Sequence, residues 1–139
     1  MNFTLYQELK AKTLTYSVKD STVLVKRKIY DFIKQKLSEV EIVRVCIHTD
    51  SNELTQLMLI GITRQTNIEF HKNENKDKLY HLIQGNLIME LENQKIRIDC
   101  GEIFKLGKGQ FARMYTTSDI AIYHEIVAGP FNPSDTIYR

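Results

Sequence analysis

The sequence is poor in cysteine and proline, and it contains no tryptophan. Only two cysteines, two prolines and six glycines occur among its 139 residues. Cys46 and Cys100 each lie inside an apolar or strand-like run rather than in a paired motif, which indicates reduced, structural thiols and favours the cytosol. Because no Pro- or Gly-rich stretch and no internal repeat interrupts the chain, we expect no interdomain linker.

Long hydrophobic runs and charge of one sign are also missing. No segment approaches the roughly eighteen continuous apolar residues of a membrane span, and the start of the chain lacks the apolar centre of a signal peptide. The formal net charge is +2, and the densest basic group, in residues 26–36, is diluted by Asp31, Glu39 and Glu41. We therefore expect a cytoplasmic protein with neither a membrane nor a nucleic acid as its partner.

One segment has the periodicity of a helix. At 139 residues and 42% hydrophobic composition, the chain has material for one domain with one sizeable core. From Lys28 to Val40 the apolar residues recur every three or four positions, which predicts an amphipathic helix in the N-terminal half. Its apolar positions are Ile29, Phe32, Ile33, Leu37 and Val40.

The rest of the sequence favours short strands separated by turns. Such a pattern is typical of a mostly β protein, either a sandwich or a barrel. Two short strands, or a strand and a cap, are predicted within Asn2 to Val25. The other predicted strands are Glu41 to His48, Leu54 to Thr63, Ile68 to His71, Leu79 to Ile83, Leu87 to Leu91, Ile96 to Ile98, Glu102 to Leu106, Ala112 to Thr116 and Ile120 to Val127.

The most informative stretch is HKNENKDKLYHLIQG, from His71 to Gly85. Its polar first half and alternating second half predict a loop that feeds a strand and ends in a turn. His71, Asn73, Lys78 and Gly85 stand at the spacing of the first motif of the cupin superfamily. In that motif these places hold two histidines, a glutamate and a glycine, so the stretch resembles a cupin motif with altered ligands.

The second cupin motif is found at its expected distance with similar changes. Gly101 and Gly109 match its glycines, while Gly107, Ala112 and Thr116 replace its proline, histidine and asparagine. The resemblance implies a small antiparallel β-barrel of the cupin, jelly-roll type. It also implies a single domain over 1–139, with N-terminal strands and the helix in 1–40, the barrel in 41–128 and a tail in 129–139.

Further motifs make the chain similar to the WbuC family of cupin-fold proteins, from about Arg27 to Thr136. The Trp-rich ending of many relatives is missing. The resemblance implies a protein encoded with genes for surface polysaccharides, such as O-antigen or capsule, whose reaction is not settled. The motifs that carry it are Arg44 to His48, Lys76, Tyr80-His81, Gly85, Ser118-Asp119, His124-Glu125, Gly129-Pro130-Phe131 and Asp135-Thr136.

The four places of the cupin metal ligands hold too few suitable donors for a metal ion. A catalytic transition metal needs about three protein ligands with imidazole or carboxylate donors. Only His71 supplies one, because Asn73 offers a weak carbonyl donor, Lys78 is a cation and Ala112 has no donor. We therefore expect no metal and no other cofactor.

Two interpretations of His71 and of Lys78 remain open. His71 is either a hydrogen-bonded barrel histidine or a general acid or base, because imidazole titrates near neutrality. As a catalyst it would take Tyr80 as its partner, since Tyr80 shares the inward parity of Lys78. Lys78 either holds an anionic group of a ligand or extends to solvent.

Other side chains are candidates for contacts with a sugar or a phosphate. Asn73 lies beside the proposed site, while Arg64, Arg113 and Tyr115 offer bidentate or aromatic contacts, with an outward strand position as the alternative for each. His48, His124 and Glu125 match family positions but fit buried, hydrogen-bonded roles better. His124 and Glu125, being adjacent on a strand, are expected to face opposite ways.

Three hypotheses of function follow. The first is a cupin without the usual metal that binds a small molecule or sugar derivative in surface-polysaccharide metabolism. The second is a metal-independent nucleotide-sugar isomerase or epimerase that acts through His71. The third is a structural or dimerisation module, in which edge strands within Met1 to Val25 pair across a two-fold axis of a homodimer.

Overall fold

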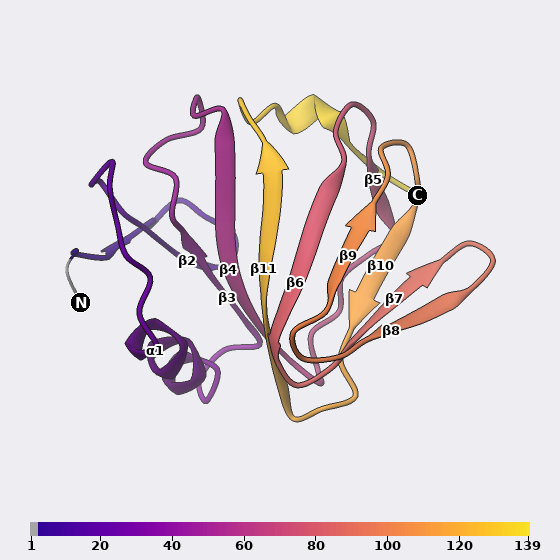
Figure 1. Cartoon of the computed structure of the whole chain (residues 1–139), viewed down its shortest axis with the longest axis horizontal. Helices are drawn as coiled ribbons and strands as arrows, with labels where there is room; N and C mark the ends of the chain where they lie inside the picture. The colour runs from indigo at the N-terminus through magenta and orange to yellow at the C-terminus, as the bar shows by residue number, and fades with distance from the viewer. Residues whose placement is uncertain (1–2) are drawn as a thin grey trace.

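The computed structural model describes residues 3–139 and consists mainly of two β-sheets (Figure 1). Residues 1–2 of the predicted N-terminal segment lie outside the described residues. The larger sheet has the strand order β1-β2-β3-β4-β11-β6-β9, and the smaller one has the order β12-β5-β10-β7-β8. This confirms a mostly β fold with an α-helix in the N-terminal half, whereas closure into a barrel stays a prediction.

The element boundaries agree with the predicted ones in most places. The predicted helix ends at Lys36 and continues only as a turn, and β5 begins at His71, where the predicted strand ended. The C-terminal strand was not predicted. The elements are β1 (Tyr6–Gln7), β2 (Leu14–Ser17), α1 (Lys28–Lys36), β3 (Ile42–Cys46), β4 (Thr55–Thr63), β5 (His71–Asn73), β6 (Lys78–Gln84), β7 (Leu87–Leu91), β8 (Lys95–Ile98), β9 (Ile103–Leu106), β10 (Ala112–Tyr115), β11 (Ile120–Ala128), the short 3-10 helix η1 (Pro133–Asp135) and β12 (Thr136–Tyr138).

One strand pair departs from the expected antiparallel arrangement. β2 and β3 are parallel, whereas the other paired strands among residues 3–139 are antiparallel. Parallel strands need a crossover connection, and here the crossover contains α1, which lies between β2 and β3 in the sequence. The crossover adds β2 and β1 to the larger sheet as an N-terminal extension, with β1 at the sheet's edge.

The first core lies between the two sheets. Alternate residues of β7, Leu87, Met89 and Leu91, are buried there, and they pack with Tyr80 and Tyr123 of the larger sheet. Period-two alternation therefore sends one side of each strand inward, as the sequence predicted. Burying one such side chain contributes about 1.5–3 kcal/mol, so this core holds the two sheets together.

The second core lies on the outer face of the larger sheet, under α1. Ile29 and Ile33 of the helix are fully buried there. A Cβ atom at Gly61 would lie 2.4 Å from Ile33 Cγ2, so the absence of a side chain at this position lets the helix approach β4 closely. Tyr30 Oη lies 2.8 Å from His124 Nε2, and burial, together with the neighbouring His81, lowers the pKa of His124.

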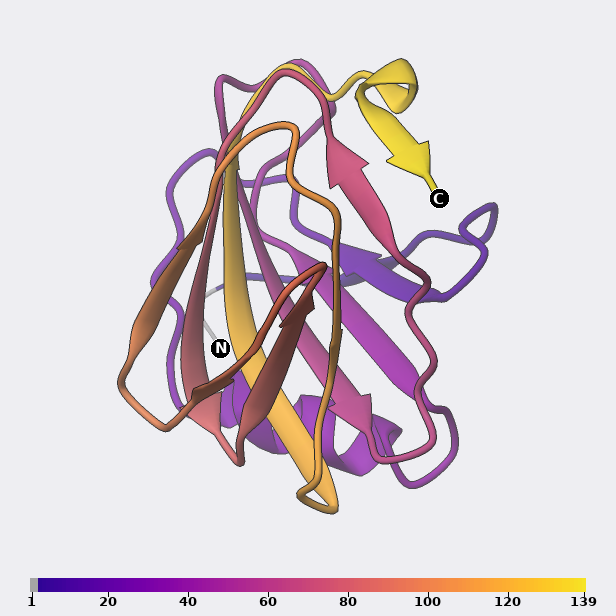
Figure 2. The same ribbon diagram turned by 90° about the vertical axis from the view of Figure 1, so that its right-hand side faces the viewer.

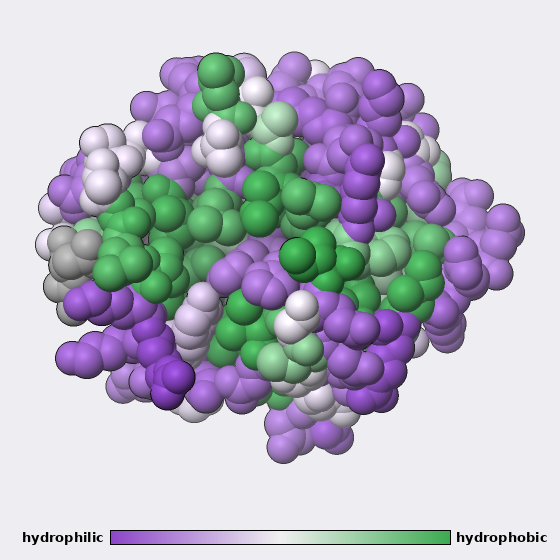
Figure 3. All heavy atoms as spheres, in the orientation of Figure 1, coloured by the Kyte–Doolittle hydropathy of each residue, from purple (hydrophilic) through white to green (hydrophobic). Residues whose placement is uncertain are grey.

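The outer face also carries exposed apolar side chains. Leu79 is 37% exposed and Ile103 is 67% exposed on the neighbouring strands β6 and β9. Figure 3 shows a hydrophobic band across the middle of the face that Figure 1 presents to the viewer. No helix among residues 3–139 is long and apolar enough to cross a membrane.

The C-terminal segment forms one edge of the smaller sheet, whose other edge is β8. β12 pairs with β5, with Thr136 opposite Asn73 and Tyr138 opposite His71. Figure 2 shows these two strands side by side, away from β6 and β9. The tail predicted in 129–139 therefore contains a strand of the smaller sheet, and its side chains reach the space between the sheets.

Candidate functional site

Two adjoining cavities open between the sheets. The first, of about 770 Å³, is lined by His48 and is called here the His48 cavity. The second, of about 870 Å³, is lined by His71 and is called the His71 cavity. Together they are called the cleft, because several side chains line both. These shared residues are Lys12, Met58, Lys78, Glu125, Phe131 and Thr136.

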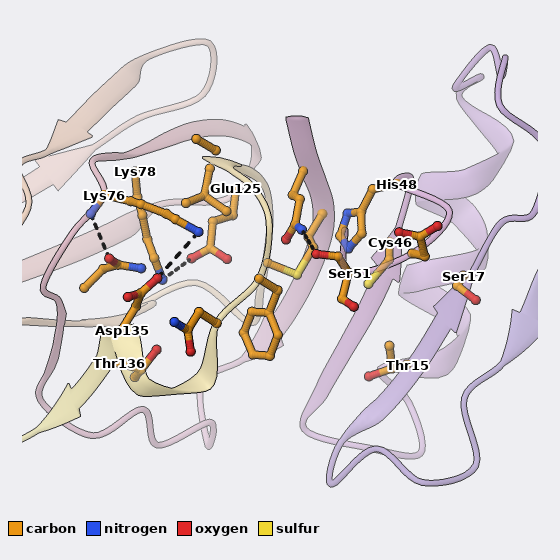
Figure 4. A pocket seen from close by; sticks show the side chains of 18 of the residues that line it. Thr15, Ser17, Cys46, His48, Ser51, Lys76, Lys78, Glu125, Asp135 and Thr136 are labelled. Carbon is orange, nitrogen blue, oxygen red and sulfur yellow. Dashed lines mark hydrogen bonds and ion pairs between the residues drawn. The ribbon is translucent and has the colours of Figure 1, made fainter. Parts of the chain in front are cut away.

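A charged pair stands where the two cavities meet. Lys78 Nζ lies 3.5 Å from Glu125 Oε1, and the two side chains are only 15% and 10% exposed (Figure 4). The register of β6 and β11 pairs Lys78 with Val127 and Tyr80 with Glu125, so the two charged residues point to the same face of the sheet. Such a pair offers a ligand both a donor and an acceptor.

A second pair ties the C-terminal tail to the loop before β6. Lys76 Nζ lies 3.5 Å from Asp135 Oδ2 and also donates to the carbonyl oxygen of Pro130. Asn75 Nδ2 donates to Asp135 Oδ1 at 2.6 Å. These contacts hold the tail against the cleft, so that Thr136 and Phe131 form part of its wall.

The four places of the cupin ligands are occupied by side chains with other partners. Asn73 Oδ1 accepts hydrogen bonds from the backbone N–H groups of Asn75 and Lys76, at 3.0 and 2.8 Å. His71 Nδ1 lies 2.8 Å from the carbonyl oxygen of Glu69. Ala112 is buried opposite His71 on the neighbouring strand β10. Lys78 is paired with Glu125.

These residues do not fit a divalent metal ion. Within residues 3–139, no three or more histidine, cysteine, aspartate or glutamate side chains lie together in a way that would hold one. At the usual cupin position the Lys78 ammonium would repel a cation, and the carbonyl oxygen of Asn73 is already used by two backbone donors. The residues at the four cupin places therefore do not form a metal site of the usual cupin kind.

Tyr80 lies in the core and not in the cleft. Its side chain is completely buried, and its hydroxyl has no hydrogen-bond partner among the described residues. Burial, and next the Glu125 carboxylate, raise the pKa of Tyr80 well above its usual value, so the phenol stays neutral near pH 7. No hydrogen bond or ring contact joins Tyr80 to His71, whose ring lies instead 5.8 Å from that of Tyr138.

The structure brings Arg64, Arg113 and Tyr115 together around a smaller cavity of about 290 Å³, and none of the three lines the cleft itself. This cavity adjoins the His71 cavity, because Thr66, Asn67, Ile68 and Met114 line both. Arg64 pairs with Asp119 at 2.8 Å in an exposed position. Arg113 pairs with Glu90 at 3.0 Å and also lies over the ring of Phe70. The ligand contacts predicted for these residues thus fall in a cavity next to the one that His71 and Lys78 line.

Sequence reasoning missed a row of polar side chains on the inner face of the larger sheet. Arg44, Cys46 and His48 alternate along the β3 segment, and all three line the cleft. His48 Nδ1 is buried without a hydrogen-bond partner in the part of the chain that the structure describes, contrary to the expected bonded role. Burial raises the pKa of Cys46 to about 11, so this thiol is not a nucleophile near neutral pH.

Glu125 was also missed as a residue of the site. Its predicted direction is confirmed, because His124 contacts Tyr30 on the outer face while Glu125 pairs with Lys78 on the inner face. The signal was present in the sequence as a carboxylate at an inward position of a strand. An inward carboxylate requires a partner, and here that partner is Lys78.

Comparison with known proteins identifies the fold. No protein-family model matches the sequence, and no curated protein matches it. Among solved structures, KdgF from Halomonas sp. matches with a TM-score of 0.59 and 18% identity over 69% of this chain and 86% of that one. A cupin superfamily protein from Desulfitobacterium hafniense matches with a TM-score of 0.57 and 13% identity over 65% and 79%.

The third comparison is with an enzyme. Pac13, a nucleoside dehydratase that has also been solved from Streptomyces with uridine, matches with a TM-score of 0.56 and 11% identity over 63% of this chain and 70% of that one. Because the identities are so low, these likenesses concern the fold alone. The chain has the cupin fold, as the motif spacing predicted.

Proposed function

We propose that this cupin-fold protein uses no catalytic metal and binds a small sugar-derived molecule in the cleft, as part of surface-polysaccharide metabolism. The observation that carries the proposal is the buried pair of Lys78 and Glu125 at the junction of two cavities. Each cavity has a volume typical of small-molecule sites, about 300–1,000 Å³. Lys78 stands at the place where the first cupin motif has a glutamate ligand.

The lining of the cleft suits a sugar better than a purely apolar ligand. Hydroxyl groups of a sugar can donate to the Glu125 carboxylate and accept from the Lys78 ammonium. Phe131 and Tyr138, which are 58% and 64% exposed, provide aromatic surface at the rim for the apolar face of a sugar ring. The fold likeness to a nucleoside dehydratase is consistent with this class of ligand.

The assignment to polysaccharide metabolism rests on the resemblance to the WbuC family. Several motifs that carry this resemblance are distant in the sequence but meet at the cleft. A set of motif residues gathered around one cavity supports a shared ligand more strongly than the same residues scattered over a surface. The motif residues that line the cleft are Arg44, Cys46, His48, Lys76, Glu125, Phe131, Asp135 and Thr136.

A matched pair of threonine variants tests binding in the cleft. Thr136 lines both cavities, whereas Thr55 is exposed at the start of β4. We expect titration calorimetry with galactose, galacturonate, uridine and UDP-glucose to reveal at least one ligand. Thr136→Tyr should weaken its binding by about tenfold or more, roughly 1.4 kcal/mol, because the larger ring fills the cleft.

In the same titrations, Thr55→Tyr should bind as the wild type does. The proposal fails if the wild type binds none of the four compounds. It also fails if the two variants bind with equal affinity, since the ligand would then lie outside the cleft. Circular dichroism of both variants confirms that each is folded before the affinities are compared.

A second candidate function, nucleotide-sugar isomerisation or epimerisation, is favoured by the tautomer of His71. A carbonyl oxygen only accepts hydrogen bonds, so the N–H group at His71 Nδ1 donates to the backbone carbonyl oxygen of Glu69. In the neutral ring this leaves Nε2 free to accept a proton. Because His71 lines the larger cavity, Nε2 is available as a general base for proton abstraction next to a sugar carbonyl.

Turnover of nucleotide-linked 4-keto sugars checks this second candidate. His71→Gln should lower kcat/KM by about 100-fold, the lower end of what a positioned acid or base contributes. His81→Gln is the control, because His81 packs against His124 on the outer face of the sheet. Equal turnover by the wild type and the His71 variant would reject the catalytic role.

A further inference from the structure

One arginine in the cleft has no ion-pair partner. Lys76 and Lys78 are each paired with a carboxylate. Arg44, which is half-buried and lines the His71 cavity, has no carboxylate oxygen within 4.0 Å among residues 3–139. A cation that is partly removed from water without a counter-ion is unfavourable, and its position inside a cavity points to a charge that a ligand supplies.

The guanidinium of Arg44 is oriented by one hydrogen bond to the protein, and its other N–H groups have no partner among the described residues. Its Nη1 atom donates to the hydroxyl of Thr13, which lines the same cavity. Within the described part of the chain, no hydrogen bond uses Nε or Nη2. That free edge of the guanidinium has the two parallel N–H groups that match a carboxylate or a phosphate.

Strand register places Arg44 on the same inner face as the central pair, with β4 between β3 and β11. Arg44 stands opposite Ile60 on β4, and Ile60 stands opposite Tyr123 on β11. Glu125 follows Tyr123 by two residues and so belongs to the adjacent row of the same inner face. An anionic group at Arg44 can therefore belong to the same small molecule whose hydroxyl groups meet Glu125.

The other charges of the His71 cavity agree with this arrangement. Lys12 is a second cation on the wall without an ion pair in the described residues, and it lines both cavities. Glu41 and Glu69 also line the cavity, but their side chains are exposed to water, which screens them. Of the carboxylates on this wall, Glu125 is the buried one, and it is neutralised by Lys78.

We propose that Arg44 binds the oxyanion of the ligand, which makes the ligand an acidic sugar derivative carrying a carboxylate or a phosphate. This inference rests on the proposed sugar-binding function and specifies its ligand class. It assigns to Arg44 the anion-binding role that the sequence suggested for Lys78, because the Lys78 ammonium already faces a carboxylate. Lys78 and Glu125 then contact the neutral part of the molecule.

Three galactose derivatives test the proposal by titration calorimetry. They are D-galactose, D-galacturonate and D-galactose 1-phosphate, so the two acidic compounds distinguish a carboxylate from a phosphate. We expect the wild type to bind at least one acidic compound about tenfold or more tightly than galactose. Arg44→Gln should abolish this preference, so that it binds the acidic compounds no more tightly than galactose.

Two further variants separate the role of Arg44 from general effects of charge and folding. Arg44→Lys keeps the charge but loses the bidentate edge, so it should retain only part of the preference. If Arg44→Gln does not fold, Arg44→Lys still tests whether Arg44 binds the anion. Arg64→Gln removes an arginine from the exposed pair with Asp119, outside the cleft, and should bind all three compounds as the wild type does.

The outcomes distinguish this inference from the proposed function. If the wild type binds galactose as tightly as both acidic compounds, the inference is overturned while sugar binding stands. An acidic preference that persists unchanged in Arg44→Gln and Arg44→Lys also overturns it, since another cation then binds the anion. If none of the three compounds binds, and none of the four compounds in the earlier titrations binds either, both proposals are rejected.

Discussion

Replacing Gly85 with alanine is expected to lower the free energy of unfolding by about 3–5 kcal/mol. Gly85 forms the turn between β6 and β7 with φ of 78°, a region that costs other residues about 1–2 kcal/mol. A Cβ atom there would also lie 2.3 Å from the carbonyl oxygen of Ile120, which is backbone and cannot rotate away. Urea unfolding followed by circular dichroism measures the loss.

Two other glycines separate the contributions of conformation and of contact. Gly101 has φ of 86°, but a Cβ atom there would meet no atom within 4 Å. Gly101→Ala should therefore cost only about 1–2 kcal/mol. Gly107 has neither a positive φ nor a close neighbour, so Gly107→Ala should be nearly neutral. Equal losses at Gly85 and Gly101 would show that the contact with Ile120 is relieved without cost.

Replacing Lys78 with methionine is expected to lower the free energy of unfolding by about 3–5 kcal/mol. The substitution keeps most of the side-chain volume but leaves the Glu125 carboxylate buried without its counter-ion, which is the costly way to break a buried pair. Glu125→Gln should be destabilising for the converse reason. In the double variant both charges are removed, so its loss should be smaller than the sum of the two single losses.

An exposed ion pair provides the control for this experiment. Asp119 pairs with Arg64 at 2.8 Å, but the two side chains are 96% and 56% exposed. Asp119→Asn should change the stability by less than about 1 kcal/mol, because water screens such a pair. Additive losses in the Lys78 and Glu125 variants would contradict a direct interaction between the two side chains and would remove the central feature of the proposed site.

The sequence identified half of the candidate site. The spacing from His71 to Gly85 placed His71 and Lys78 on the wall of one cleft, and the structure has both there. Glu125 was judged structural, because a sequence does not show which strands become neighbours. Arg44 was noted only as part of a motif, since whether an arginine has a partner depends on carboxylates that are distant in the sequence.

The positions predicted for sugar contacts also show that the sequence does not reveal which distant residues become neighbours. Arg113 and Tyr115 are correctly placed on a strand, and they do line a cavity with Arg64. That cavity adjoins the cleft, but Arg113 and Tyr115 do not line the cleft itself, because they alternate along β10 with the buried Ala112 and Met114. Alternation along a strand predicts which residues share a face, but not which cavity that face meets.

Local patterns in the sequence were sufficient for the helix and nearly all the strands. Both depend on residues within a few positions of one another, such as the alternation of β7 or the periodicity of α1. Tertiary structure alone decided that Lys78 meets Glu125, 47 residues away, that no carboxylate of residues 3–139 pairs with Arg44, and that Thr136 of β12 lines the cleft. The physical reason is that strand order and register, which form through long-range pairing, determine which distant side chains share one cavity.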